Sequence, residues 1–192
     1  HTPLPDDLLH MRDLVPEDEY RYQTIYAKNE GAVVAPTAGF HFSREVIKKM
    51  EIKGIDTCFI TLHSGLGNFR AIEVEDLTKH KMDSEQMIIN EDNARMINNA
   101  KAAGRKVCTV GTSSMKAVET AAIIDNRVKV FNGWTNKFIF PPYEFAISDA
   151  MITNFHPPLS SMLMQVAAFG GYELIMNAYK YAIEKRSEER RV

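Results

Sequence analysis

The chain contains 192 residues, of which 45% are hydrophobic, so it is long enough to bury a core and is not expected to be disordered. Its 23 Lys and Arg residues are balanced by 25 Asp and Glu residues, and the net charge of −2 excludes recognition of nucleic acid through a uniformly basic surface. Any contact with nucleic acid is then expected to be a local patch.

The sequence predicts a soluble, cytoplasmic protein that does not enter membranes. No apolar stretch approaches the roughly 20 residues that span a bilayer, and no signal peptide opens the chain. Cys58 and Cys108 lie in apolar runs without metal-binding spacing, which predicts reduced core residues. The Pro-rich opening HTPLPDDLL lacks Met, so we expect residues 1–16 to be a connector from a missing N-terminal part and residues 17–192 to be the main α/β domain.

The first third of the chain predicts two helices and two strands. Acidic residues at 17–19 lead into YRYQTIYAKNEG, whose apolar spacing predicts a helix that ends at Gly31. The short run AVVAP is typical of a buried strand. Ser43 is a good N-cap for a helix over 44–53, and IDTCFITL predicts another buried strand over 55–62.

The second third alternates between strands and helices. QMIIN is predicted as a strand, Asn90 as the cap of a helix that ends near Gly104, and RKVCTVG as the next strand. A helix from residue 112 and the strand RVKVF follow. Connections this short favour parallel strands joined by crossovers. We therefore predict an α/β fold, a barrel-like or open, mostly parallel sheet with surrounding helices.

The last third departs from this alternation. NGWTNKFIFPPYEF predicts a loop with short strands, AMITNF a strand, and HPPLSS a loop. Two helices, MLMQVAAFG and YELIMNAYKYAIEKRSEERR, are expected to finish the chain.

Polar residues follow several predicted strands, and in a parallel sheet ligands bind at the carboxyl ends of the strands. The polar candidates after the strands at 32–36 and 55–62 and after AMI at 150–152 are Thr37, Gly39, His41, His63, Arg70, Asn154 and His156. After the strand that ends at Val110, Thr112 and Ser113 bring hydroxyl groups to a helix N-terminus, which favours an anion or a ribose-like polyol. The alternative is that these two residues only cap the helix.

Four histidines in loops, His41, His63, His80 and His156, are candidates for acid–base chemistry near neutral pH. Each of them alone has an equally good interpretation as a hydrogen-bonded structural residue. The chain has no HExxH motif and no paired Cys/His spacing, so no metal site is predicted.

Ordered motifs along the chain carry a resemblance to a known family. YRYQTIYA, GAVVAPTAGFHF, ITLHSGLGNFRAIEVED, HKMDSE, VGTSS, PPYEF and DAMITNFHPPLSSMLMQVAAFGG together resemble the S-adenosylmethionine:tRNA ribosyltransferase-isomerases of queuosine biosynthesis. The resemblance runs from residue 1 to about residue 184 and covers the C-terminal portion of that family's chain. It implies that the family's additional small β-barrel domain is not covered by this sequence.

The resemblance implies an enzyme that transfers and isomerises the ribosyl moiety of S-adenosylmethionine onto 7-aminomethyl-7-deazaguanine at the tRNA wobble position. The product is epoxyqueuosine, and adenine and methionine are released. S-adenosylmethionine is then a consumed substrate and no cofactor is expected. The implied partners are tRNA that carries the deazaguanine precursor and S-adenosylmethionine, and we expect a monomer.

Loop position, residue type and the family motifs together assign candidate roles. The catalytic candidates are His41, His63, His80, Glu85 and His156. The substrate-binding candidates are Thr37, Gly39, Arg70, Ser84, Thr112, Ser113, Glu119 and Asn154.

Two other functions stay open. Asp83, Lys116 and Leu159 depart from residues that are more usual in the family, which is compatible with a tRNA-binding or accessory module of the same fold with impaired catalysis. The GTSS turn alone is compatible with an unrelated α/β enzyme that acts on a phosphorylated sugar, although that turn brings no Lys or Arg of its own.

Overall fold

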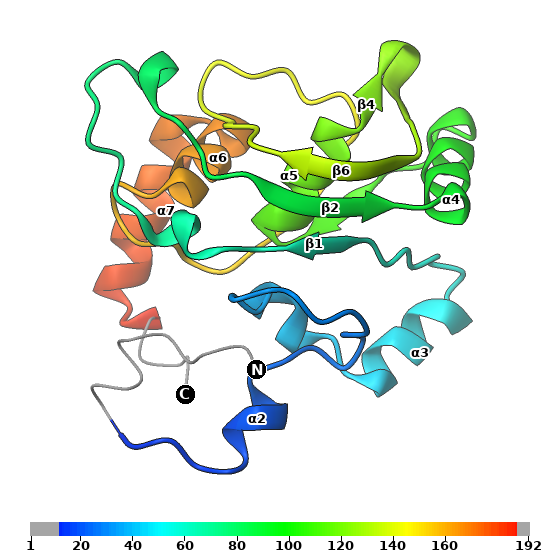
Figure 1. Ribbon diagram of the computed structural model, residues 1–192, viewed down its shortest axis with the longest axis horizontal. Helices are drawn as coiled ribbons and strands as arrows, with labels where there is room; N and C mark the ends of the chain where they lie inside the picture. The colour runs from blue at the N-terminus through cyan, green and yellow to red at the C-terminus, as the bar shows by residue number, and fades with distance from the viewer. Residues whose placement is uncertain (1–11, 188–192) are drawn as a thin grey trace.

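A three-stranded antiparallel sheet runs through the middle of the protein, with helices behind it and beside it (Figure 1). The structure is a computed structural model that describes residues 12–187. The sheet consists of β1 (Thr61–His63), β2 (Glu85–Ile89) and β6 (Phe131–Thr135), with β2 in the centre and antiparallel to both neighbours. Alternate residues of β2, from Glu85 to Ile89, are buried, as expected of a strand with one face on the core.

Two smaller ladders complete the described strands. β3 (Cys108–Val110) pairs in parallel with β7 (Ala150–Ile152), while β4 (Ala122–Ile123) and β5 (Arg127–Val128) form an antiparallel hairpin. The carboxyl end of β3 leads directly into the helix α5.

Side-chain caps start three of the helices. The Ser43 hydroxyl accepts a hydrogen bond from the N–H of Val46 at 3.2 Å, and the Asn90 side chain accepts one from the N–H of Asn93 at 2.8 Å. Ser160 caps a later helix in the same way. The helices are α2 (Asp18–Arg21), α3 (Arg44–Ile52), α4 (Glu91–Ala102), α5 (Thr112–Thr120), α6 (Ser161–Gly170) and α7 (Tyr172–Glu184), and short 3₁₀ turns cover Thr37–His41, Leu66–Phe69, Leu77–Lys79 and Ile124–Asn126.

The hydrophobic core lies between the central sheet and the helices α4 and α5. Met87 and Ile89 from β2 and Ile147 from the loop before β7 are fully buried there. Ala117 and Ala121 at the buried face of α5 let the helix approach the sheet closely, because alanine side chains are small.

The predicted α/β class, with helices and a parallel pair of strands, is confirmed. The helices after Ser43 and Asn90 and the helix over 161–170 form close to the predicted bounds. The helix from residue 112 ends at Thr120 and the last helix ends at Glu184, which is earlier than the sequence predicted, and residues 188–191 of that last prediction lie outside the described residues. The other ladders among residues 12–187 are antiparallel: β2 does not pair with β3, because the chain crosses to a separate two-stranded ladder after α4.

Three local predictions differ from the structure. The first helix ends at Arg21 instead of reaching Gly31, because the backbone of Tyr22 leaves the helical conformation and the tertiary contacts of Tyr22 with Phe40 and of Tyr26 with Phe59 replace helix formation there. The predicted strand at 32–36 is an irregular segment, in which the N–H groups of Val33 and Val34 both donate to the Ser64 carbonyl at 2.8 and 3.3 Å. The strand predicted over 55–62 forms a ladder only at Thr61–His63.

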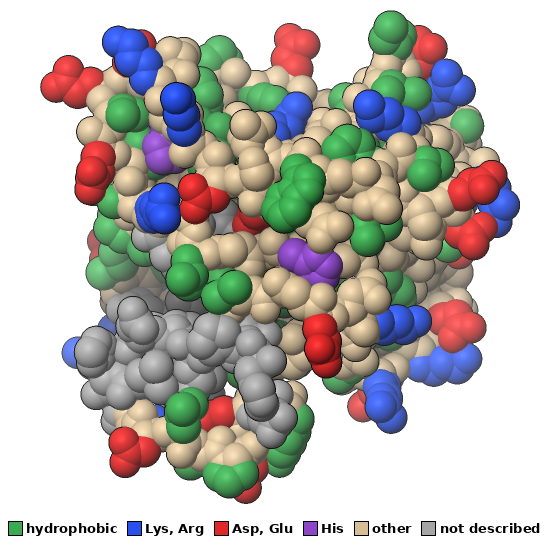
Figure 2. All heavy atoms as spheres, in the orientation of Figure 1, with side chains coloured by type: hydrophobic (Ala, Val, Ile, Leu, Met, Phe, Trp, Pro, Cys, Tyr) green, Lys and Arg blue, Asp and Glu red, His purple; other side chains and the backbone are tan. Residues whose placement is uncertain are grey.

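Both cysteines are free thiols, and Cys58 is half-buried, but Cys108 is exposed at the start of β3 and is not the core residue that was predicted. No helix in the part of the chain that the structure describes is long and apolar enough to cross a membrane. On the face shown in Figure 2, Lys and Arg side chains lie in small groups at the edges, interspersed with acidic ones, as the balanced composition predicts.

Candidate active site

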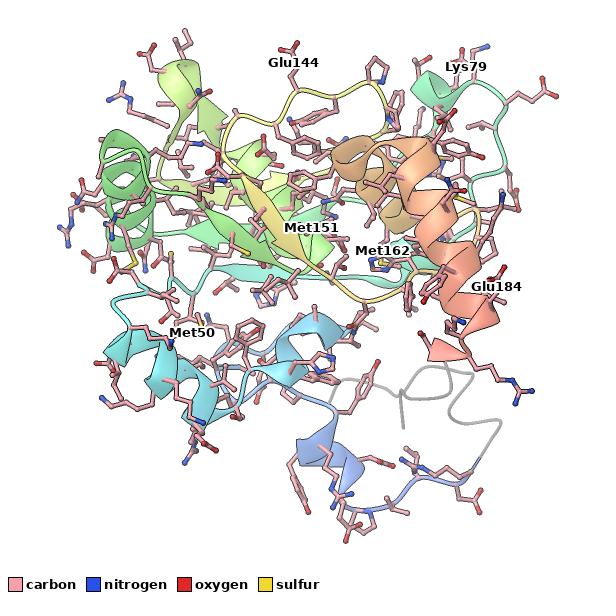
Figure 3. All side chains as sticks on the ribbon, turned by 180° about the vertical axis from the view of Figure 1, so that it is seen from behind. Met50, Lys79, Glu144, Met151, Met162 and Glu184 are labelled. Atoms are coloured by element: carbon pink, nitrogen blue, oxygen red, sulfur yellow. The ribbon has the colours of Figure 1, made fainter. Side chains whose placement is uncertain are left out.

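A small cleft of about 10 Å³ opens where α5, α6 and the segment after β6 meet. Its lining combines hydroxyl, amide, cationic and aromatic side chains. The residues that line it are Met82, Thr112, Ser113, Lys116, Lys137, Phe138, Ile139, Ser161, Met162 and Gln165. Met162 projects from α6 toward the body of the molecule in Figure 3, whereas Lys79 lies on a turn at its outer edge.

A buried ion pair links the cleft to the central sheet. Lys116 of α5 donates a hydrogen bond to Oε2 of Glu85, the first residue of β2, and both side chains are almost fully buried. The other carboxylate oxygen, Oε1, accepts the N–H of Gly65 at 3.0 Å. Both oxygens of Glu85 are therefore held. Burial lowers the pKa of Lys116 to about 8, so loss of solvent outweighs the attraction of the carboxylate.

Hydroxyl groups from two elements meet beside this pair. α5 begins at Thr112 after Gly111, whose φ of 91° is readily adopted only by glycine. Ser113 lies one turn before Lys116 and therefore on the same face of the helix. Its Oγ is 3.3 Å from the Oγ of Ser64, which directly follows β1.

The helix α6 fixes the start of α5 from the other side. Gln165, which is 6% exposed, donates a hydrogen bond from Nε2 to the Thr112 carbonyl oxygen at 2.8 Å. Ser161 at the first turn of α6 is buried and lines the same cleft. Two helix N-termini therefore converge on this position, and helix N-termini favour negatively charged or oxygen-rich ligands.

An aromatic edge borders the cleft. The His80 ring lies 4.9 Å from the Phe138 ring, centroid to centroid, and Phe138 in turn lies 4.9 Å from Phe140. Phe138 itself lines the cleft, so His80 stands one ring away from it. Ser84 is exposed at the end of the same polar stretch.

A second polar group joins two loops. The Asn154 side chain donates a hydrogen bond to Thr37 Oγ1 at 3.0 Å, which brings together residues 117 positions apart. Next to Thr37, the backbone of Gly39 packs so closely on Tyr26 that an added Cβ would lie 2.1 Å from the phenol oxygen. His156 follows Asn154, and its Nε2 lies 2.9 Å from Thr153 Oγ1.

Besides this second polar group, four more of the predicted site residues do not line the cleft. His41 is exposed, and the His63 ring packs against the backbone of Gly31. Arg70 forms an exposed ion pair with Asp83 at 3.3 Å, a type of pair that contributes little to stability. Glu119 holds the segment before β7, because its buried carboxylate accepts three backbone N–H groups from residues 146–148 at 2.9–3.0 Å, and its predicted contact with substrate stays a prediction.

The structure brings together Glu85, Thr112 and Ser113, with His80 nearby, and adds residues that were not predicted. The added residues are Ser64, Lys116, Lys137, Phe138, Ser161 and Gln165. A sequence signal existed only for Lys116, which follows Thr112 and Ser113 at helical i+4 and i+3 spacing. The others come from distant parts of the chain.

A larger cavity of about 290 Å³ lies between α3 and the β3 side of the molecule, and Met50 of α3 lines it (Figure 3). Its lining is mainly apolar and contains none of the predicted site residues. The small polar cleft is lined by the predicted residues Thr112 and Ser113. Its enclosed volume admits about one water-sized group, so it is the better candidate for contacts to one polar end of a larger ligand. Within residues 12–187, no cluster of three or more His, Cys, Asp or Glu side chains could hold a metal ion.

Comparisons with known proteins give a consistent result. A family model described as a queuosine biosynthesis protein matches residues 1–188. The S-adenosylmethionine:tRNA ribosyltransferase-isomerase of Phocaeicola vulgatus is 61% identical over 184 residues, and that of Parabacteroides distasonis is 60% identical over 185 residues. In both cases the match covers 96% of this chain and 52% of the relative, so the chain spans about half the length of these relatives.

The fold is also similar to a solved structure. The crystal structure of the S-adenosylmethionine tRNA ribosyltransferase from Thermotoga maritima matches with a TM-score of 0.63 and 33% sequence identity. This match covers 78% of the chain described here and 47% of the other one.

Proposed function

Because the chain belongs to the queuosine biosynthesis protein family, we propose that it carries the catalytic α/β part of an S-adenosylmethionine:tRNA ribosyltransferase-isomerase. The proposed reaction transfers and isomerises the ribosyl moiety of S-adenosylmethionine onto 7-aminomethyl-7-deazaguanine at the wobble position of tRNA. Its products are epoxyqueuosine in the tRNA, adenine and methionine. In this proposal, residues 17–192 form the catalytic part and residues 1–16 a connector, although residues 1–11 and 188–192 lie outside the described residues.

One observation supports this function more than any other: the cleft joins a held carboxylate–ammonium pair, Glu85 and Lys116, to the hydroxyl groups of Thr112 and Ser113. Hydroxyl groups, helix N–H groups and an ammonium suit the polar parts of S-adenosylmethionine, which are its ribose hydroxyls and its amino-acid carboxylate, because both offer oxygen atoms for hydrogen bonds. The hydroxyl, N–H and ammonium groups of the cleft can therefore form hydrogen bonds with the polar groups of this substrate.

The chemistry requires a base, an acid and a nucleophile. The sulfonium charge acidifies the neighbouring 5′ carbon, so that a base can remove a proton from it, and protonation assists the departure of adenine. The aminomethyl nitrogen of the tRNA base then attacks the ribose-derived carbon. Among the four candidate histidines, His80 is our first candidate for one of these proton transfers, because its ring packs on Phe138, which lines the cleft.

Several further features of the proposed enzyme follow from its family. Its partners are tRNA with the deazaguanine precursor and S-adenosylmethionine, which is consumed as a substrate. We expect a cytoplasmic monomer that needs no cofactor. Thr37 and Asn154, joined by a hydrogen bond, form the proposed contact to a second part of the substrate.

The second candidate is a tRNA-binding or accessory module with impaired catalysis. The observation that favours it is the set of departures at Asp83, Lys116 and Leu159. Asp83 is engaged with Arg70, and the Leu159 carbonyl accepts the N–H of Ile72 at 2.9 Å, so two of the three residues serve local structure. Only Lys116 lies in the cleft.

One experiment separates the two candidates. The intact gene product is incubated with S-adenosylmethionine and tRNA that carries the precursor, and the digested tRNA is analysed by mass spectrometry. The enzyme yields the epoxy-cyclopentanediol adduct and free adenine, whereas the accessory module binds tRNA without forming the adduct. In single-turnover assays of adenine release we expect His80→Gln to slow the reaction about 100-fold, while Lys49→Gln, at an exposed position of α3 outside every candidate site, serves as the control.

A further inference from the structure

The ammonium group of Lys116 is held from one side and faces the cleft from the other. Glu85 accepts one of its hydrogen bonds, and a lysine ammonium has three donors, so two remain for other acceptors. The side chain is 5% exposed and lines the cleft beside Thr112 and Ser113. Glu85, fixed by the Gly65 N–H, therefore orients Lys116 while Lys116 presents its other donors to whatever enters.

The groups around Lys116 favour a negatively charged ligand. Lys137 lines the same cleft and brings a second positive charge, while Glu85 is already neutralised by its partner. The nine-residue helix α5 begins at Thr112, so the positive end of its dipole and its first N–H groups lie at the same place. The hydroxyl of Thr112 adds a further donor, and that of Ser113 adds another when Ser64 is the donor in the Ser64–Ser113 hydrogen bond.

We infer that Lys116 binds the carboxylate of the amino-acid portion of S-adenosylmethionine, with Glu85 as its positioning residue. The inference rests on the proposed function, because it assigns one part of that substrate to one part of the cleft. A sulfonium is repelled by Lys116 and Lys137, so the substrate must lie with its carboxylate toward α5 and its sulfonium away from it. Phe138, at the other edge of the cleft, offers a ring face that attracts cations.

Binding should depend on pH in a defined direction. The titratable groups that face the cleft are Glu85 from β2, Lys137 from the segment after β6, and His80 across Phe138, while Glu119 of α5 is turned to residues 146–148. Burial lowers the pKa of Lys116 to about 8, so the ammonium is present below pH 8 and is lost above it. Affinity for a carboxylate ligand is therefore expected to fall as pH rises from 7 to 9.

Two ligands test the assignment. S-adenosylhomocysteine carries the carboxylate, whereas 5′-methylthioadenosine has the same nucleoside without it, and neither has a sulfonium. Binding of both is measured by calorimetry to the intact gene product, wild type and variants. Lys116→Met removes the cation from beside the buried Glu85 carboxylate and risks misfolding, so the double variant Glu85→Gln/Lys116→Met is measured beside it. Lys116→Arg keeps a positive charge that is not lost up to pH 9, and Lys49→Met, at an exposed position of α3, is the matched control.

We expect both methionine variants to bind S-adenosylhomocysteine at least 10-fold more weakly and 5′-methylthioadenosine within 2-fold of wild type. Lys116→Arg should keep most of the affinity and lose the decline above pH 8. The assignment of Lys116 is overturned if the variants lose affinity equally for both ligands, or lose affinity for neither. In that case the proposed function still stands, provided that the wild type binds S-adenosylmethionine and releases adenine. If the wild type neither binds S-adenosylmethionine nor releases adenine, the proposed function itself fails, and the inference with it.

Discussion

The buried carboxylate of Glu119 is expected to hold the segment before β7 in place. Oε1 accepts the N–H groups of Ile147 and Ser148 at 3.0 and 2.9 Å, and Oε2 accepts that of Ala146 at 3.0 Å. In Glu119→Gln one oxygen becomes an amide donor, so two hydrogen bonds lose their charge and one N–H is left facing another donor. Because charged hydrogen bonds exceed neutral ones by about 1 kcal/mol and an orphaned buried N–H costs about 1–3 kcal/mol, we expect a loss of roughly 3 kcal/mol in the free energy of unfolding.

Urea unfolding followed by circular dichroism measures this loss. Glu144→Gln is the matched control, because Glu144 lies on the same segment but points outward into solvent (Figure 3), and it should change the stability by less than about 0.5 kcal/mol. A loss at Glu119 no larger than that of the control would refute the structural role. If Glu119 has only this structural role, the amount of substrate bound per folded molecule of Glu119→Gln should equal that of the wild type. If Glu119 contacts substrate, as the sequence predicted, that amount should fall.

A spectroscopic titration gives an independent readout of the same residue. The pKa of Tyr143 is raised to about 12, first by burial and then by the charge and hydrogen bond of Glu119. Removing that charge makes the tyrosinate easier to form, so the pKa should fall part of the way toward its usual value of about 10. Absorbance at the tyrosinate band during an alkaline titration follows this change.

Two further substitutions test other parts of the fold. Gly31→Ala places a Cβ 2.7 Å from Nδ1 of His63 at a φ of 139°, so we expect a loss of about 1–3 kcal/mol in urea unfolding, with Gly65→Ala, which has open space around it, as the nearly neutral comparison. Asn98→Ala removes two hydrogen bonds to the backbone of Val128, at 2.9 and 2.7 Å, and should cost about 2–3 kcal/mol and speed amide hydrogen exchange at Val128. Unchanged exchange at Val128 would contradict this role of Asn98.

Local patterns in the sequence determined the helices well. Ser43 and Asn90 each bond to an N–H three residues later, and such a bond depends only on the neighbouring chain. The approximate positions of β2 and β3 and the turn before α5 followed from short runs of apolar residues in the same way. The order of motifs also indicated the family, because several motifs in a fixed order are specific to a family although no single one of them is.

The tertiary structure alone decided which strands pair and which polar side chains meet. β2 and β3 follow one another with one helix between them, yet each pairs with a strand from another part of the chain, because pairing depends on how the chain closes over the core. Lys116 and Glu85 are 31 positions apart, and Glu119 bonds to residues 27–29 positions away. The sequence identified Glu85 and Glu119 as candidate site residues, but it did not identify Lys116 as one. Only the tertiary structure decides that Lys116 faces the cleft and that Glu119 instead accepts backbone hydrogen bonds from residues 146–148. The reason is that a buried charge needs a partner, and the fold determines which partner lies next to it.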